Sequence, residues 1–451
     1  MYTMLLVMFY FLIQFGLTII MRKARTAPDY VVAEGQARLI PLAASLVGTT
    51  VGGGMFLGFS LLAFDNPVAA ISISVTYLMG SVMIGFLSPF FRQYALQIGA
   101  TSPHHVVESL DKQSGGKFAS IFELVQLAVY IIMLAAQFVS MMAFFSYLQG
   151  KDDNFAYLLG IGCVIALLIS YAYSGGLRRD IASDLLQFVF LLLGAVAIMS
   201  LKILPDSAAI TISQQSLSPT IGTLALCFFV LVSLLPTFVV RFDIWQRVLA
   251  AESDRSAKWA FILSGITSSV FFVIFGLAGV LAAARGISRS SYVGLDYLLD
   301  NTSDIYHGLI FVCFFAAVMS SADTFLGVSG LSLNGVLQKF KFVPSGIFGI
   351  NISVFITGAV AAAIAYWAGD IVMLFSSAFA MLSAFAPPFL IDFRGQFGVL
   401  KYVTRIVLAS LGLFAVVFVF SPSLAFAVPF IVSLLISVGV AWKNSVMQRH
   451  P

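Results

Sequence analysis

Two short stretches of the chain combine backbone breaks with the oxygen atoms that could hold a monovalent ion. The first, Gly48-Thr-Thr-Val-Gly-Gly-Gly-Met-Phe-Leu-Gly58, puts three consecutive glycines inside an apolar segment. Each glycine costs roughly 1 kcal/mol of helix propensity relative to alanine. Gly54 and Gly58 alone could serve close helix packing. Together with the hydroxyls of Thr49 and Thr50, the stretch favours an unwound helix with carbonyls facing a cation and amides facing an anionic or polar solute.

The second stretch is Ala316-Ala-Val-Met-Ser-Ser-Ala-Asp-Thr-Phe325, which places two adjacent serines in an apolar segment. The hydroxyls of Ser320 and Ser321 could bond back to carbonyls of their own helix. They could also join carbonyls of the broken helix in a neutral oxygen cage. Such a cage suits a sodium ion, because hydroxyl and carbonyl oxygens are hard ligands.

The remaining chemistry-bearing residues indicate neither an enzyme nor a redox or metal centre. Cys163, Cys227 and Cys313 lie singly in apolar segments, without ligand spacing. His104 and His105 are adjacent, so they cannot share one helix face, and we interpret them as a loop pair. No Walker, kinase or other catalytic motif is visible, which argues against ATP as an energy source.

Composition predicts an all-α integral membrane protein. The chain is 60% hydrophobic and 10% charged, and its net charge of +4 is too small to suggest nucleic acid as a partner. About thirteen apolar segments are long enough to cross a bilayer. They are residues 2–21, 38–63, 66–91, 118–149, 155–175, 180–204, 220–250, 257–285, 306–338, 346–369, 370–391, 401–421 and 423–443.

The basic residues predict the orientation of these spans. The first segment is followed rather than preceded by basic residues, the reverse of a signal peptide, so we expect an uncleaved helix with the N-terminus outside. Thirteen spans then leave the C-terminus in the cytoplasm, with a bacterial inner membrane as the expected location. The basic residues that fall on the outer side are Lys151, Lys202, Arg285 and Arg289.

Four motifs, taken in their order along the chain, resemble those of the sodium/solute symporter family. They are GTTVGGGMFLG, the Ser320-Ser321-Ala-Asp stretch, Gly175-Gly-Leu-Arg-Arg-Asp-Ile-Ala-Ser-Asp184-Leu-Leu-Gln187 and Trp245-Gln-Arg-Val-Leu-Ala-Ala-Glu-Ser253. The resemblance implies a leucine-transporter-type fold of two inverted five-helix repeats with discontinuous helices. The parts would be an N-terminal extra helix and loop (1–37), a first repeat (38–204), an external loop (205–219), a second repeat (220–391) and two C-terminal helices with a tail (392–451).

The resemblance also implies a sodium site, position by position. The carbonyls of Gly48, Val51 and Ala317 and the hydroxyls of Ser320 and Ser321 would form it. Asp184 occupies the family's acidic position near the cytoplasmic exit and would draw sodium off the site. Asp184 could equally serve the helix dipole, since it lies within the first two turns of its helix.

Gate and substrate residues follow from polar groups inside the apolar segments. Asp323 is expected to pair at a gate with Arg241 or Arg247, because a charge within a span is costly. Arg241 departs from the family's polar pair and could instead pair with Asp243. Glu123, Gln126, Tyr130 and Gln137 form one polar helical stripe, which serves either helix packing or the substrate. For substrate, Gln126 and Tyr130 are preferred over the other two. Pro236 predicts a second helix break beside Thr237, and the substrate candidates are Thr50, Gly52, Gly53, Met55, Gln126, Tyr130 and Thr237.

The predicted function is sodium-coupled import of a small organic solute by alternating access. Amino acids or small organic acids are favoured, because half-helix amides suit a carboxylate. The alternative is a membrane-embedded solute sensor of the same fold. The absence of a kinase or relay motif argues against that alternative.

Overall fold

The structure, a computed structural model, describes residues 2–20, 24, 26–114, 118–149, 176–200, 221–300, 302–393, 397–420 and 425–449. Within these ranges the regular secondary structure is helical, apart from one isolated parallel bridge between Ala37 and Ala251. The predicted span 155–175, Cys163 and the predicted external loop 205–219 lie outside the described residues.

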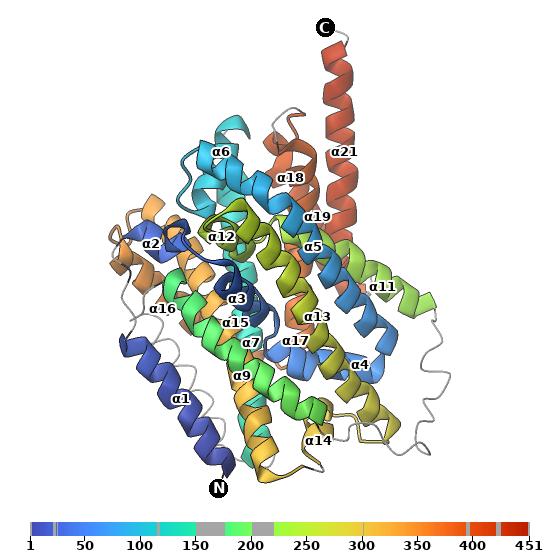
Figure 1. The fold of residues 1–451 in the computed structure, drawn as a ribbon. Coiled ribbons are helices and arrows are strands. Elements are labelled where there is room, and N and C mark those ends of the chain that lie inside the picture. Colours follow the sequence, from blue (N-terminus) through green and yellow to red (C-terminus); the bar gives the residue numbers. More distant parts are fainter. Residues whose placement is uncertain are drawn as a thin grey trace.

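Long apolar helices run through the whole height of the molecule (Figure 1). Nine helices of the described chain are long and apolar enough to cross a membrane, and two bent helix pairs could add two more spans. The all-α membrane fold predicted from composition is therefore confirmed, whereas the count of thirteen spans is not. The nine are α5 (Pro67–Gln97), α7 (Phe118–Gln149), α9 (Leu177–Ser200), α13 (Asp254–Ala284), α15 (Asp304–Lys339), α16 (Ile347–Trp367), α17 (Ile371–Ser383) continuing into α18 (Ala386–Asp392), α19 (Val403–Phe420) and α21 (Val428–Arg449). Helix α1 (Tyr2–Ile20) contains a shorter apolar stretch, Leu5–Leu17.

Both helix breaks predicted from the sequence are present. Helix α3 (Leu39–Thr50) ends at the glycine stretch, and the chain continues through a π-helical turn, η2 (Gly54–Phe59), into α4 (Ser60–Asp65), bent by 57°. Helix α11 (Ile221–Leu234) passes through a 3-10 turn, η3 (Leu235–Val239), and is bent by 41° from α12 (Phe242–Ala250). The second break opens at Val240 and Arg241, a few residues beyond Pro236.

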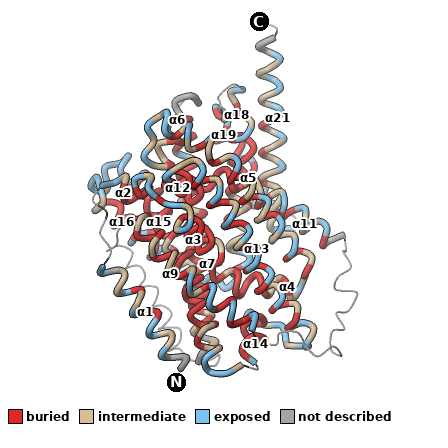
Figure 2. The backbone as a smooth tube through the Cα atoms, in the orientation of Figure 1, coloured by how far each residue is buried: buried red, intermediate tan, exposed pale blue. Residues whose placement is uncertain are grey.

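The two broken helices meet at the centre of the helix bundle. Helix α15 packs against α7, α9, α16 and α3, while α13 packs against α5, α3 and α4. Buried residues concentrate along these inner helices, and exposed ones appear along α1, α11 and α21 (Figure 2). The outer helices expose large apolar side chains, among them Trp367 at 79% and Phe420 at 83%, as expected for surfaces that face lipid.

Short elements close one end of the bundle. Helix α2 (Ala27–Val32) and helix α6 (Pro103–Ser114) lie near α12 at the end from which α21 projects (Figure 1). Ala37 is tied to the α12–α13 connection by the Ala37 N–H donating to the Ala250 carbonyl, at 2.8 Å. Arg178 pairs with Asp29 at 3.1 Å and with Glu34 at 3.2 Å. At the opposite end, α14 (Val293–Leu299) follows α13.

Candidate functional site

The first break presents helix-end carbonyls directly to α15. The hydroxyl of Ser321 donates to the carbonyls of Gly48 and Thr49, at 3.0 and 3.1 Å. The last carbonyls of any α-helix lack intrahelical partners, so these acceptors exist because α3 ends at Thr50. Val51 is fully buried at the break, and Ala317 is fully buried one turn before Ser320 and Ser321 on α15. The structure thus brings Gly48, Ser320 and Ser321 together at one helix crossing, with Val51 at the same break and Ala317 on the preceding turn of α15.

Glycine is needed at this crossing because the helices approach closely. A Cβ atom on Gly52 would lie 2.5 Å from the hydroxyl of Ser321 and 2.8 Å from the amide nitrogen of Gln137. A Cβ atom on Gly53 would lie 2.4 Å from the Cβ atom of Ser140. Separations this short do not occur between real atoms, so a side chain at either position would push α7 or α15 away from the break.

Asp184 lies beside the first break and binds two hydroxyl groups. Ser320 donates to one carboxylate oxygen, and Ser45 donates to the other at 2.5 Å. All three side chains are buried. Neither Ser320 nor Ser321 bonds back to its own helix among the hydrogen bonds of the described chain, so their hydroxyls serve contacts between helices.

Arg247 of α12 holds four helices together around Asp184. Its guanidinium is fully buried, and Nη2 donates to hydroxyls of α3 and α15 and lies near two carboxylates of α9. These neighbours are Ser45 at 3.0 Å, Thr49 at 2.9 Å, Thr324 at 2.8 Å, Asp180 at 3.5 Å and Asp184 at 3.8 Å. Asp180 and Asp184 are four residues apart on one helix face, a spacing that could have revealed this cluster from the sequence.

The expected ion pair of Asp323 with Arg241 or Arg247 is wrong, because both arginines pair with other carboxylates. Arg247 pairs with the α9 carboxylates, and Arg241 pairs with Asp243. Asp323 makes no ion pair within the described chain. Two residues along α15 correspond to about 200° of rotation from Ser321, which turns Asp323 to the far side of the helix.

The second break is organised by a buried ion pair. The Nη2 and Nε atoms of Arg241 lie 2.5 and 2.9 Å from the carboxylate oxygens of Asp243. Tyr130 donates its hydroxyl to the same carboxylate, and Gln126 donates to the carbonyl of Val240 at 2.6 Å. Thr237 donates to the carbonyl of Leu234 at 2.7 Å. These side chains supply hydrogen bonds to the backbone carbonyls and to the carboxylate that the break leaves inside the membrane.

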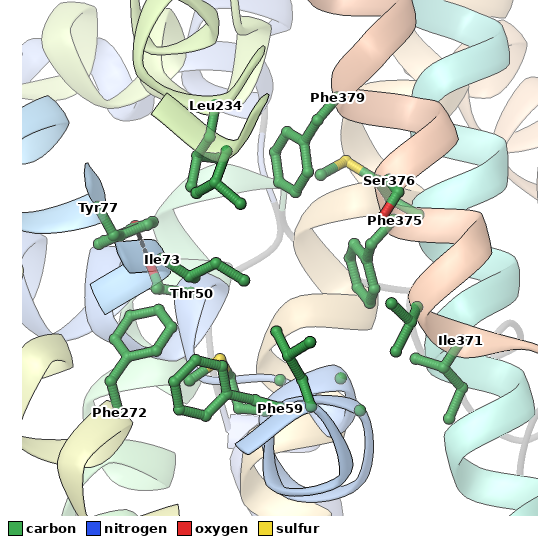
Figure 3. Close-up of a pocket in the computed structure, with 18 of the residues that line it drawn as sticks. Thr50, Phe59, Ile73, Tyr77, Leu234, Phe272, Ile371, Phe375, Ser376 and Phe379 are labelled. Atoms are coloured by element: carbon green, nitrogen blue, oxygen red, sulfur yellow. Dashed lines mark hydrogen bonds between the residues drawn. The ribbon is translucent and has the colours of Figure 1, made fainter. Parts of the chain in front are cut away.

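A cavity of about 180 Å³ lies between the two breaks. Thr50, Ile73, Tyr77 and Phe272 lie on one side of it and Ile371, Phe375, Ser376 and Phe379 on the other, with Phe59 below (Figure 3). Thr50 and Tyr77 share a short hydrogen bond across the first side. The lining also includes Thr49, Gly52, Gly54, Met55, Gly58, Leu62, Met133, Gln137, Phe229, Val230, Ser233, Leu234, Arg241, Phe325 and Val372.

The predicted substrate residues divide between the cavity and its supports. Thr50, Gly52 and Met55 line the cavity. Gly53 lies just behind it, with its N–H donating to Gln137 Oε1 at 2.9 Å. Gln126, Tyr130 and Thr237 do not line this cavity. They brace the second break instead, because their polar groups meet the backbone and Asp243 there.

The polar stripe of α7 is buried as predicted, and one of its four members lines the cavity. Gln137 lines the cavity, whereas Glu123, Gln126 and Tyr130 are used elsewhere. Glu123 pairs with Lys339 at 2.6 Å. The aromatic side chains of α13 and α17 were not identified from the sequence, since phenylalanine in a membrane helix carries no signal of its own.

Fold and site together define the class of protein. A multi-pass bundle with two broken helices crossing at its centre is the leucine-transporter-type fold. Over 98% of this chain and 97% of the other, it superimposes on a Na⁺-coupled sialic acid symporter in a substrate-bound outward-open state, with a TM-score of 0.71 and 14% identity. The closed, bromovinylhydantoin-bound form of Mhp1, a nucleobase-cation-symport-1 family transporter, gives a TM-score of 0.62 and 15% identity over 95% of this chain and 96% of that one.

Sequence similarity leads to proteins named as cotransporters. Sodium/myo-inositol cotransporter 2 of Bos taurus is 30% identical over 196 residues, which are 43% of this chain and 28% of the relative. The protein of the same name from Homo sapiens is 29% identical over 197 residues, again 43% and 28%. The chain thus matches less than a third of each relative's length, and no family model matches it. The resemblance to sodium/solute symporters noted from the motifs is confirmed, and these relatives are not enzymes.

Proposed function

We propose that this protein is a sodium-coupled symporter that imports a small organic solute by alternating access. One observation carries the proposal: carbonyls freed at the end of α3 meet the Ser321 hydroxyl of α15, next to a cavity between two broken helices. The carbonyls of Gly48, Val51 and Ala317 with the hydroxyls of Ser320 and Ser321 supply neutral oxygen ligands. Broken helices inside a membrane are tolerated where they line a cavity or bind something.

Coupling follows from the shared position of the ion site and the cavity. Sodium bound at α3 and α15 holds the broken helix in one arrangement, and Thr49, Thr50 and Gly52 of that segment line the cavity. The ion therefore raises the affinity for the solute. Asp184 lies beside the site and draws sodium toward the exit, while Arg241 acts at the inner gate through its pair with Asp243. One charge crossing 100 mV is worth about 2.3 kcal/mol, or roughly 50-fold accumulation of a neutral solute.

The proposed orientation places the N-terminus outside and the C-terminus in the cytoplasm of a bacterial inner membrane. The two termini lie at opposite ends of the bundle (Figure 1). The end from which α21 projects carries basic residues, since Arg178 pairs there with Asp29 of α2 and Lys443 belongs to α21 itself, in keeping with retention of positive charge in the cytoplasm. The repeats would comprise residues 38–204 and 220–391, with a lipid bilayer and a small solute as partners and neither ATP nor nucleic acid involved.

The proposal is tested by thermal unfolding of the detergent-purified protein with sodium or potassium at constant ionic strength. We expect a sodium-specific rise in melting temperature, because a ligand that binds only the folded state stabilises it. Ser321→Ala should abolish the rise. Ser329→Ala is the matched control, since Ser329 is also buried on α15 but donates to the carbonyl of Leu326.

Uptake into liposomes then separates the symporter from the sensor. A sodium gradient should drive accumulation of a solute that stabilises the protein. An equal response to sodium in wild type and in Ser321→Ala would reject the ion site. Sodium-dependent stabilisation by a solute without any uptake would reject transport and favour the solute sensor.

A further inference from the structure

The walls of the cavity between the broken helices are mainly apolar and aromatic. Six phenylalanines line it, together with leucine, isoleucine, valine and methionine side chains from α4, α5, α7, α11 and α17. In Figure 3 the rings of Phe59, Phe272, Phe375 and Phe379 surround the open space. Desolvating a hydroxyl against such walls without a hydrogen-bond partner costs free energy, so a polyol would be rejected.

Three of the polar side chains that line the cavity keep a hydrogen-bond donor without a partner in the described part of the chain. Arg241 uses Nε and Nη2 on Asp243, and its Nη1 makes no hydrogen bond within the described part of the chain. Gln137 accepts from the Gly53 N–H with Oε1, which leaves its Nε2 donor without a partner in the same part of the chain. The hydroxyl of Ser376 likewise has no partner there, and it points into the space between α17 and the first break (Figure 3).

The described lining contains no acidic side chain. Asp243, two residues from the lining residue Arg241, is turned toward Arg241 and Tyr130. An ammonium group in the cavity would therefore lack a carboxylate to balance it. A carboxylate, in contrast, would meet the free donors of Arg241, Gln137 and Ser376. The apolar walls and the free donors of the cavity therefore fit an anion attached to an apolar body and disfavour an amine.

From these observations we propose that the solute is a small monocarboxylate with an aromatic or branched aliphatic body and no amino group. Its carboxylate binds Arg241 Nη1, Gln137 Nε2 and the Ser376 hydroxyl, and its body packs between Phe272 and Phe375. This inference rests on the proposed symport function and specifies its substrate class. It differs from the polyol named for the similar cotransporters.

Charge balance connects this substrate to the ion. The Arg241–Asp243 pair is neutral as a unit, so a bound carboxylate brings an uncompensated negative charge into a buried site. A sodium ion at the first break would supply the missing positive charge close by, because the cavity-lining residues Thr49 and Gly52 are the chain neighbours of the proposed ligands Gly48 and Val51. Solute and ion then enter as a neutral pair, and each should strengthen the binding of the other by the same factor.

The experiment measures thermal stabilisation and sodium-driven uptake with four probes: phenylacetate, its neutral analogue phenylacetamide, phenethylamine and myo-inositol. In sodium, phenylacetate should bind the protein with an affinity at least about tenfold higher than that of phenylacetamide, since hydrogen bonds to a charged group are stronger than neutral ones. Phenethylamine and myo-inositol should have no effect. 4-Methylpentanoate, a branched aliphatic acid, should behave like phenylacetate.

Matched variants locate the carboxylate. Arg241→Gln combined with Asp243→Asn removes both charges together, so no unpaired charge remains buried, and it should erase the preference for acid over amide. Ser376→Ala should weaken phenylacetate binding about tenfold, whereas Ser377→Ala, which lies outside the cavity lining, should not change it.

The outcomes separate this inference from the function on which it rests. Equal binding of phenylacetate and phenylacetamide, binding of myo-inositol in their place, or a sodium response without any effect of either carboxylate would overturn the substrate class. Carboxylate binding and uptake that ignore sodium would leave the substrate class standing and overturn sodium coupling.

Discussion

Replacing Arg247 with methionine should destabilise the protein more than any other single loss of charge in the described chain. The side chain is fully buried and donates to Ser45, Thr49 and Thr324, with two α9 carboxylates at 3.5 and 3.8 Å. Methionine has a similar length but leaves these carboxylates without their cation. Removing one partner of a buried pair costs about 3–5 kcal/mol.

In a chain of 451 residues a loss of 1 kcal/mol lowers the melting temperature by about 1 °C. We therefore expect Arg247→Met to melt about 3–5 °C below wild type in sodium-free buffer, measured by tryptophan fluorescence. Adding Asp180→Asn removes one of the two unpaired charges, so the double variant should recover part of the loss. Arg289→Met is the control, because Arg289 is 64% exposed and its contact with Asp65 lies at the surface.

Two results would refute this reasoning. If Arg247→Met has the same melting temperature as the Arg289→Met control, the guanidinium does not hold the carboxylates. Alternatively, the double variant could be no more stable than Arg247→Met, which would mean that the loss comes from packing rather than from charge.

Three further predictions concern close packing and pH. Gly279→Ala places a Cβ atom 2.0 Å from a backbone carbonyl oxygen of α4 and should strongly reduce folded protein, whereas Gly412→Ala, with no atom within 4 Å, should be neutral in the same solubility assay. Gly53→Ala should lower the free energy of unfolding by about 1–3 kcal/mol, because the new Cβ atom collides with Ser140. Adding Ser140→Gly to this variant should restore the melting temperature, and a double variant that is no more stable would contradict the contact. Burial and the nearby Lys339 lower the pKa of His104 to about 4, below its unfolded value of about 6.5. The stability that neutral His104 contributes is thus complete above pH 6.5 and is lost as the pH falls toward 4, by at most about 3 kcal/mol. The melting temperature of His104→Gln should therefore depend less on pH over this range than that of the wild type. An equal pH dependence in both proteins would contradict the lowered pKa.

The broken helices could be predicted because their sequence signals are local. Three successive glycines destabilise a helix, and Pro236 removes one helical hydrogen bond, so both breaks follow from the properties of the backbone. The pairing of Ser321 with the end of α3 required the resemblance to a known family, because periodicity alone does not say which helices cross.

Side-chain partners inside the bundle were less accessible to sequence reasoning. Asp323 was assigned to Arg241 or Arg247, yet each arginine is closer to another carboxylate, a choice decided by helix rotation in three dimensions. Tyr130 and Gln137 share one polar stripe, and only the position of each break along α7 determines which one faces the cavity. The aromatic walls could not be recognised, because phenylalanine facing lipid and phenylalanine facing a solute look alike in sequence.

The central claim is that a sodium ion binds where α3 ends against Ser321 of α15. The most direct test is equilibrium binding of radioactive sodium to the purified wild type, Ser321→Ala and Ser329→Ala proteins. We predict saturable binding to the wild type and to Ser329→Ala, displaced by unlabelled sodium but not by potassium, and its loss in Ser321→Ala. Saturable sodium binding that survives in Ser321→Ala, or no saturable binding to the wild type, would contradict the account.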